Sequence, residues 1–232
     1  MSTNESQQLR RMGPTMGLRR PNWIAQGRQQ DIGLVRDRSL SMMGQKAEDE
    51  SIACCELVKE VGRPYNKDAF RVAVIDFSGT SDLVHDFEKA SVLMGTMKKV
   101  RVDTKGTGTD IALGLMNTVI LLDSSRDYLE NTTMRPVVIL LTDGLHNAYS
   151  DPLKIADHLK KKADLLTVAF GDDADEELLK EIASTPKHFY RCLSGKELRA
   201  FLGYVGTSLT TAMHTSQSCT ETLSRLPQQL SQ

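Results

Sequence analysis

Continuous apolar runs recur along the chain and predict buried strands. The strongest run covers residues 136–141 (PVVILL) and is bounded by polar and turn-forming residues. Runs of roughly four to eight apolar residues are typical of strands that are covered on both faces of a sheet. In the segment 83–87, polar residues are interspersed among apolar ones, and the pair Ser78-Gly79 before it ends the preceding strand. This pattern predicts a strand at the edge of the sheet. The buried strands predicted in this way are 32–35, 70–77, 136–141, 165–170 and 188–193.

Amphipathic segments of helical length lie between these strands. In 45–61, for example, Ala53, Leu57 and Val61 recur at helical spacing. The pair Asp151-Pro152 resembles the N-cap and first-turn proline of another helix. The predicted helices are 45–61, 110–129, 151–162, 175–184 and 196–212. Strands that alternate with such helices predict an α/β fold, with a doubly wound, mostly parallel central sheet, helices on both faces and one antiparallel edge strand.

The length of 232 residues fits one domain with an extension at each end. Residues 1–29 are polar and show little apolar periodicity, which predicts an N-terminal extension. This extension is either a loosely packed tail or a basic arm that docks onto a partner with Trp23 as its anchor. Residues 30–212 form the predicted domain, and residues 213–232, which are polar and rich in Ser, Thr and Gln, form a predicted C-terminal tail.

The numbers of positively and negatively charged residues are almost equal, which argues against nucleic acid as a partner. With 29 Lys and Arg against 30 Asp and Glu, the net charge is -1, so there is no basic surplus for binding nucleic acid. No apolar run approaches the roughly 20 residues that cross a bilayer, and the first residues do not resemble a secretory signal. We therefore expect a cytoplasmic protein that binds neither nucleic acid nor membrane. The four cysteines show no C-x-x-C spacing that would indicate a zinc site.

Oxygen-bearing side chains follow the predicted strands. Asp37, Ser39 and Ser41 alternate after the first strand, Thr109 precedes a helix, and Asp143 follows the strongest strand. In doubly wound folds, ligands bind outside the carboxyl ends of the strands. Carboxylates and hydroxyls are ligands for hard cations such as Mg²⁺ or Mn²⁺. The spacing therefore predicts a site for a hard divalent cation at this edge of the sheet.

These motifs resemble those of the von Willebrand factor A domain family. Its metal-ion-dependent adhesion site (MIDAS) combines D-x-S-x-S, a Thr in a G-T context and an Asp in a T-D-G context. The resemblance covers residues 30–212 and extends to the stretch at 156–171 (ADHLKKKADLLTVAFG). The intracellular bacterial branch associated with tellurium resistance (TerY-like) and stress operons looks most similar. The resemblance implies that the metal ligands are Asp37, Ser39, Ser41, Thr109 and Asp143.

The resemblance also implies a function. A Mg²⁺ or Mn²⁺ held mainly by hydroxyls keeps a coordination position open, which an acidic side chain of a partner protein would fill. We therefore expect a non-enzymatic module for protein–protein recognition in a bacterial stress-response or signalling complex, with a kinase, phosphatase or ATPase encoded nearby as partner. The candidate residues for the partner-binding rim of the site are Ser78, His146, Asn147 and Tyr149.

Two residues depart from the pattern of the family. Arg36 stands where the family usually has an apolar residue, and a guanidinium beside Asp37 would repel a cation. Leu40 stands where the family usually has the more flexible Gly.

Two other functions compete with metal-dependent recognition. A Mg²⁺-dependent phosphatase or phosphotransferase would use an aspartate after the first strand as nucleophile, and Asp37 has that position. Such chemistry also needs an acid two residues later, where this chain has Ser39. The second alternative is an interaction scaffold that needs no metal.

Overall fold

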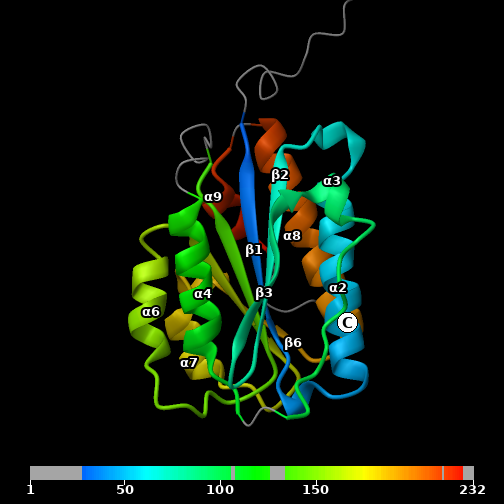
Figure 1. Ribbon diagram of the computed structural model, residues 1–232. Coiled ribbons are helices and arrows are strands. Elements are labelled where there is room, and N and C mark those ends of the chain that lie inside the picture. The colour runs from blue at the N-terminus through cyan, green and yellow to red at the C-terminus, as the bar shows by residue number, and fades with distance from the viewer. Residues whose placement is uncertain (1–27, 106–107, 126–133, 216, 227–232) are drawn as a thin grey trace, which may run out of the picture.

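The computed structural model describes residues 28–105, 108–125, 134–215 and 217–226. Its centre is a six-stranded sheet with the order β3-β2-β1-β4-β5-β6 (Figure 1). Antiparallel pairing occurs only between β2 and β3, and the other pairs are parallel, which confirms the predicted fold class. The strands are β1 (Gln30–Asp37), β2 (Phe70–Phe77), β3 (Ser81–Lys89), β4 (Val137–Thr142), β5 (Asp164–Phe170) and β6 (Phe189–Cys192).

Helices cover both faces of the sheet, and each face has its own hydrophobic core (Figure 1). On one face, α2 (Gln45–Val61) packs against α8 (Gly195–Thr215), beside α3 (Ala90–Leu93) and α9 (Cys219–Leu223). On the other face, α4 (Ile111–Ser124), α6 (Pro152–Leu159) and α7 (Glu176–Ile182) lie side by side. Three short 3-10 helices complete the described elements: η1 (Leu40–Met42), η2 (Pro64–Asn66) and η3 (Pro186–His188). No helix in the described ranges is long and apolar enough to span a membrane.

The order of the strands determines where the chain reverses direction across the sheet. From β1 the chain continues to β2 and β3 on one side, and it then crosses to β4, β5 and β6 on the other side. The central strand β1 therefore pairs with both β2 and β4, and all eight of its residues are buried. At such a switch point the loops after the neighbouring strands diverge and leave room for a ligand. The predicted metal ligands after β1 and β4 lie at this point.

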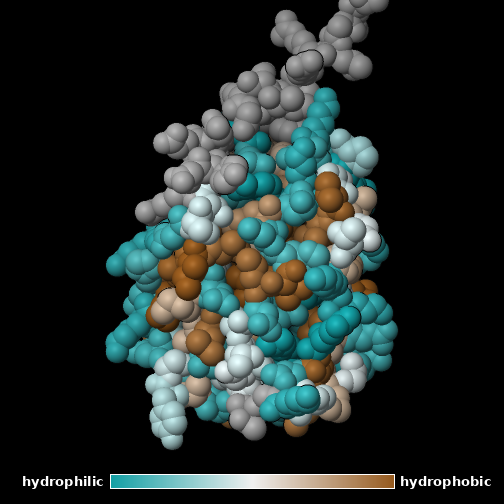
Figure 2. Space-filling model, viewed as in Figure 1, coloured by the Kyte–Doolittle hydropathy of each residue, from teal (hydrophilic) through white to brown (hydrophobic). Residues whose placement is uncertain are grey.

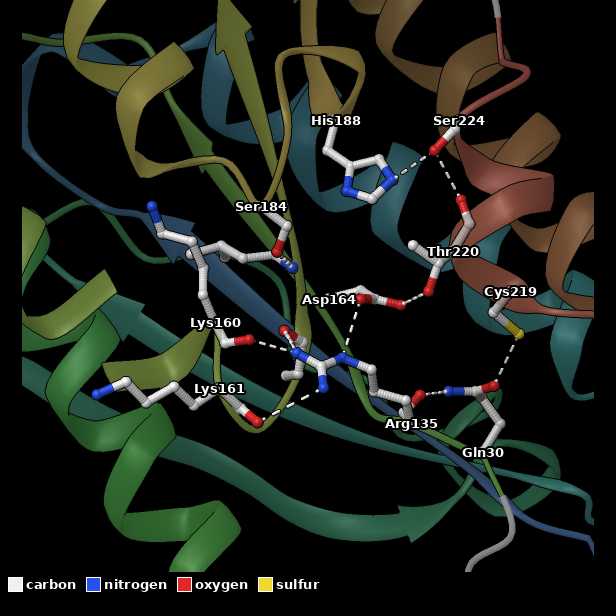
Figure 3. A network of polar contacts seen from close by, with 12 residues as sticks. Gln30, Arg135, Lys160, Lys161, Asp164, Ser184, His188, Cys219, Thr220 and Ser224 are labelled. Carbon is white, nitrogen blue, oxygen red and sulfur yellow. Dashed lines mark hydrogen bonds and ion pairs between the residues drawn. The ribbon is translucent and has the colours of Figure 1, made fainter. Parts of the chain in front are cut away.

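The C-terminal region differs from the predicted tail. Helix α8 continues to Thr215, and α9 then packs against the core with Leu223 fully buried. The hydroxyl of Tyr190 donates to the carbonyl of Leu223 at 2.8 Å. A ring nitrogen of His188 lies 3.1 Å from the hydroxyl of Ser224 (Figure 3). A few apolar residues among many polar ones are enough to dock the short α9, which explains why the hydrophobic pattern did not reveal it.

A polar network at the amino-terminal edge of the sheet connects this C-terminal segment to the strands (Figure 3). Arg135 donates from Nε to Asp164 at 2.9 Å, and Thr220 of α9 hydrogen-bonds to the same carboxylate. Gln30 at the start of β1 donates to the carbonyl of Arg135 at 2.5 Å and accepts from the thiol of Cys219 at 3.0 Å. These contacts stabilise the edge opposite the predicted metal site. Of the predicted N-terminal extension only its last two residues are described, and Trp23 lies outside the described residues.

Apolar side chains are exposed on the face over α4 and β3 (Figure 2). They include Leu113, Met116 and Ile120, which recur along the outer side of α4, and Leu83 on the edge strand. This surface flanks the sheet and is separate from the switch point at the carboxyl edge.

Candidate metal centre

Asp37 is the last residue of β1, and its carboxylate is fully buried. The backbone N–H of Ser39 donates to its Oδ1 at 2.7 Å, and the hydroxyl of Thr142 donates to its Oδ2 at 2.6 Å. Burial raises the pKa of Asp37, although the hydrogen bonds from Ser39 and Thr142 oppose this shift. The nearby charge of Asp143 raises the pKa of Asp37 further. Two carboxylates held close together in a buried position favour the binding of a cation between them.

Ser39, Ser41 and Asp143 form a chain of contacts beside Asp37. The two serine hydroxyl oxygens lie 3.0 Å apart, and the hydroxyl of Ser41 donates to Oδ1 of Asp143 at 2.7 Å. Ser41 lies in the 3-10 turn η1, which begins three residues after the end of β1, and Asp143 follows the last residue of β4. Because β1 and β4 are neighbouring parallel strands, their ends bring these side chains together.

Thr109 reaches the same place from the loop before α4. A methyl group built on Gly144 would lie 3.4 Å from the hydroxyl oxygen of Thr109 and 3.5 Å from that of Ser41. Thr109 is held by Asn147, whose side-chain oxygen accepts from the Thr109 N–H at 2.6 Å and whose own N–H donates to the Thr109 carbonyl at 3.1 Å. Gly108 has φ +108°, and a side chain there would collide with Asn147. The structure therefore brings all five predicted ligands to one place.

The donors fit a hard divalent cation. Two carboxylates and three hydroxyls supply oxygen atoms only, which is the ligand type that Mg²⁺, Mn²⁺ and Ca²⁺ prefer. Within the described residues, no group of three or more His, Cys, Asp and Glu side chains has the arrangement of a metal site. Sites of that composition are typical of zinc or iron. The candidate centre differs from such sites, because three of its five donors are neutral hydroxyls and only two are charged carboxylates.

Lys46 also belongs to this site, although the sequence analysis missed it. It lies in the first turn of α2, and its ammonium contacts Oδ2 of Asp143 at 2.5 Å. A second carboxylate oxygen, of Asp173, lies 3.8 Å from the same ammonium. The position of Lys46 five residues after Ser41, in the first turn of the predicted helix, was a signal that could have indicated it.

Arg36 is directed away from the metal centre, because successive side chains of a strand point to opposite faces. It is fully buried and donates from Nε and Nη2 to the two carboxylate oxygens of Asp76, at 2.7 and 3.1 Å. Its Nη1 donates to the carbonyl of Lys98 at 3.0 Å. The positive charge next to Asp37 is thus balanced by Asp76.

Leu40 does not prevent the loop from closing. It begins the 3-10 turn η1 with a negative φ, so a glycine is not required at this position. The N–H of Met43 donates to its carbonyl at 3.0 Å. Its side chain is exposed next to the metal centre.

The residues predicted for the rim have different positions. Ser78 is buried rather than exposed, which corrects its assignment to the rim, and its hydroxyl donates to Asp103 at 2.9 Å. His146 accepts from the N–H of Ile111 at 3.3 Å through Nδ1, and Asn147 orients Thr109 as described above. Tyr149 is fully exposed. Ser78 therefore supports the loops from inside, whereas the exposed Asn147 and Tyr149 and the half-buried His146 are still predicted rim residues.

Solved structures of other proteins share this fold. Proximal thread matrix protein 1 from the mussel byssus matches with 22% identity and a TM-score of 0.61, over 83% of this chain and 46% of that protein. The mussel protein has also been solved with a zinc-occupied MIDAS motif. The pilus adhesin SpaC from Lactobacillus rhamnosus GG matches with 15% identity and a TM-score of 0.63, over 82% of this chain and 31% of the adhesin. The chain thus spans less than half the length of either protein.

A third solved structure matches over nearly its whole length. The vWF domain of the type V pili tip protein Mfa5 from Porphyromonas gingivalis shares 14% identity at a TM-score of 0.62, over 80% of this chain and 96% of that domain. At such identities the likeness shows the fold alone. No curated protein sequence matches the chain. The family model of the von Willebrand factor type A domain matches residues 31–202, and with this match over most of its length the chain belongs to the von Willebrand factor type A domain family.

Proposed function

We propose that this protein is a non-enzymatic recognition module that binds an acidic side chain of a partner protein through Mg²⁺ or Mn²⁺. The gathering of Asp37, Ser39, Ser41, Thr109 and Asp143 at the switch point of the sheet carries this proposal. Domains of this family generally mediate metal-dependent protein–protein interaction and adhesion, which supports it.

The five residues would hold the cation with few negative charges. The hydroxyls of Ser39, Ser41 and Thr109 are neutral donors, so only Asp37 and Asp143 contribute formal charge. A bound divalent cation supplies a Lewis acid that accepts a carboxylate oxygen of the partner. The internal hydrogen bonds to Asp37 and Thr109 hold the donors in place before a partner arrives.

The surroundings of the site also favour a protein partner. Leu40 and Met43 on the turn after β1 are more than half exposed, and so are Leu145 and Tyr149 on the loop after β4. Large apolar and aromatic side chains near a polar site are typical of the energetically important part of a protein interface. We infer that the partner presents its acidic residue next to apolar side chains.

The enzymatic alternative has less support. As a nucleophile, Asp37 would need an oxygen that faces a substrate, but it is fully buried and both of its oxygens accept hydrogen bonds. The position two residues later is Ser39, which is not an acid for protonating a leaving group. Failure to hydrolyse p-nitrophenyl phosphate in the presence of Mg²⁺ is the expected result.

The cellular context is proposed from sequence resemblance alone. The resemblance to the tellurium-resistance branch supports a cytoplasmic bacterial stress-response or signalling complex, with a kinase, phosphatase or ATPase as partner. Co-purification of the full chain with the products of neighbouring genes, with and without chelator, tests this assignment. A partner retained in chelator would instead support a metal-independent scaffold.

Thermal melting tests the metal site. Saturating Mn²⁺ at about 100 times its dissociation constant adds about 2.7 kcal/mol, which raises the Tm by roughly 5 to 10 °C. Asp143→Ala should abolish this rise, whereas Asp157→Ala on the exposed side of α6 should retain it. A rise in Tm that persists in Asp143→Ala would contradict the assignment.

Peptide selection then tests the acidic partner. Peptides selected from a random library on the full chain in Mn²⁺ should contain Asp or Glu and should be released by chelator. Replacing that residue by Asn or Gln should abolish binding, because a neutral amide is a weaker metal ligand than a carboxylate. Selected peptides that bind equally well in chelator would count against metal-dependent recognition.

A further inference from the structure

Lys46 is placed so that its ammonium reaches the metal centre from a helix on one face of the sheet. Its Nζ contacts Oδ2 of Asp143 at 2.5 Å, and the carboxylate of Asp143 is fully buried. The side chain crosses over Gly171 at the end of β5, where a methyl group would lie 3.5 Å from Nζ and 3.6 Å from Cε. Gly171 has φ +90°. These distances are ordinary van der Waals contacts, so the lysine side chain lies against Gly171 on its way to Asp143.

The ammonium has a second carboxylate within reach. Oδ2 of Asp173 lies 3.8 Å from Nζ of Lys46, and the side chain of Asp173 is 83% exposed. The lysine side chain itself is 34% exposed. A small movement of a flexible, partly exposed side chain would transfer the ammonium from the buried carboxylate to the exposed one.

The ammonium of Lys46 changes the net charge that a divalent cation would meet at the site. Among the groups that are buried or half-buried at the centre, Asp37 and Asp143 carry two negative charges and Lys46 carries one positive charge. The carboxylate of Asp173, in contrast, is 83% exposed, and its charge is screened by water. Arg36 does not change this sum, because Asp76 balances it. A divalent cation would therefore leave the site with one excess positive charge, and a partner carboxylate would remove that excess.

We propose that Lys46 competes with the divalent cation for Asp143 and thereby couples metal binding to the binding of an acidic partner. The inference rests on the proposed function of the site and adds a regulatory residue to it. In the free protein the ammonium lowers metal affinity by occupying Oδ2 of Asp143 and by repelling the cation. A partner carboxylate compensates for the excess charge, so metal and partner each raise the affinity for the other.

Mn²⁺ binding to the full chain tests this coupling. Free Mn²⁺ is measured by electron paramagnetic resonance for the wild type, Lys46→Met and Lys46→Arg. Because a unit charge close to a divalent cation in a partly buried site changes a binding constant strongly, Lys46→Met should bind Mn²⁺ about ten times more tightly or better. Lys46→Arg should stay close to the wild type. Lys59→Met, which removes an exposed lysine of the same helix, is the matched control and should have no effect.

Acetate serves as the carboxylate probe for the second half of the proposal. At constant ionic strength, replacing chloride by acetate should tighten Mn²⁺ binding to the wild type several-fold and have a clearly smaller effect on Lys46→Met. Asp173→Asn, which removes the second carboxylate, should weaken Mn²⁺ binding to the wild-type lysine about two- to fivefold. Melting in chelator establishes that each variant is folded.

The outcomes separate this inference from the proposed function. If the wild type binds Mn²⁺ through Asp143 but Lys46→Met binds no more tightly, Lys46 is only a structural ion pair and the inference is overturned while the metal site remains. An equal effect of acetate on both proteins would overturn the coupling. If neither protein binds Mn²⁺ in a manner that depends on Asp143, the proposed function and the inference both fail.

Discussion

Two ion pairs, one buried and one partly buried, join β1 to β2 at positions that face each other in the sheet. Asp31 is aligned with Arg71, and Arg36 is aligned with Asp76. The two pairs have opposite polarity along the strands, so a shift of register would separate all four charges from their partners. We predict that Asp76→Asn, which removes one charge and keeps the shape, strongly destabilises the fold.

The magnitude follows from the burial of the pair. Arg36 is fully buried and only 6% of the Asp76 side chain is exposed, so the variant leaves a cation inside the protein without a counter-charge. Removing one partner of a buried pair costs about 3 to 5 kcal/mol. For a chain of this size, that loss lowers the Tm by roughly 6 to 20 °C.

The loss of stability in Asp76→Asn is compared with that in two variants of less buried ion pairs. Asp31→Asn makes the same change at the other pair, but the Arg71 side chain is 13% exposed and its guanidinium lies 5.3 Å from the centre of the Phe87 ring. Its loss should be smaller, because this cation keeps contact with water and with an aromatic face. Glu221→Gln affects an ion pair whose side chains are two-thirds exposed, so it should change stability by less than about 1 kcal/mol.

Urea unfolding followed by circular dichroism, with calorimetry for the Tm, measures these differences. The pair can also be replaced as a whole by Arg36→Met combined with Asp76→Leu. Removing both charges from water works against their mutual attraction, and burial raises the pKa of Asp76 although the charge of Arg36 and the hydrogen bond with it oppose this shift. The double variant should therefore be within about 1 kcal/mol of the wild type or more stable. If Asp76→Asn costs no more than Glu221→Gln, the reasoning about this pair is refuted.

Two further predictions concern other buried groups. Both carboxylate oxygens of Glu50 are buried, and neither has a hydrogen-bond partner among the residues that the structure describes. Burial raises the pKa of Glu50 well above 4.5. The native state therefore keeps a proton that the unfolded state releases, so stability falls as pH rises above about 4.5; Glu50→Gln should melt at a higher temperature than the wild type near pH 7 and lose this advantage near pH 4. Leu223→Ala, which truncates the fully buried side chain of Leu223 in α9, should cost about 2 to 5 kcal/mol in urea unfolding, and a loss below about 1 kcal/mol would mean that α9 is not part of the core.

Most of the fold follows from local patterns. Buried strands such as Val137–Thr142 and helices such as Ile111–Ser124 have uninterrupted apolar faces, so their positions can be predicted without knowledge of the rest of the chain. Helix α9 could not be predicted in this way, because it is short and its stability depends on tertiary contacts with Tyr190 and Asp164. Beyond these elements, the short α3 at Ala90–Leu93 has too few residues for a periodic pattern.

In the candidate site, too, residues in local motifs could be predicted from the sequence, whereas residues whose roles depend on tertiary contacts could not. Asp37, Ser39 and Ser41 are close in sequence, and Thr109 and Asp143 are recognisable by their short motifs. The roles of Ser78 and His146 depend on which backbone groups they meet across the loops, and sequence spacing carries no such information. Lys46 reaches Asp143 across 97 positions of sequence, a contact that only the packing of α2 against the end of β4 creates.

The distribution of fixed and adaptable groups explains how one fold can serve many partners. Internal hydrogen bonds hold the buried Asp37 and Thr109, so these proposed metal donors would themselves contribute little selectivity. The groups that can respond to a partner are the exposed side chains near the centre, such as Leu40 and Tyr149, and the partly exposed Lys46. Function in such folds is determined by the site rather than by the scaffold. Because these responsive residues lie on loops and in the first turn of a helix, they can change without disturbing the sheet, which is consistent with a shared fold at identities of only 14 to 22%.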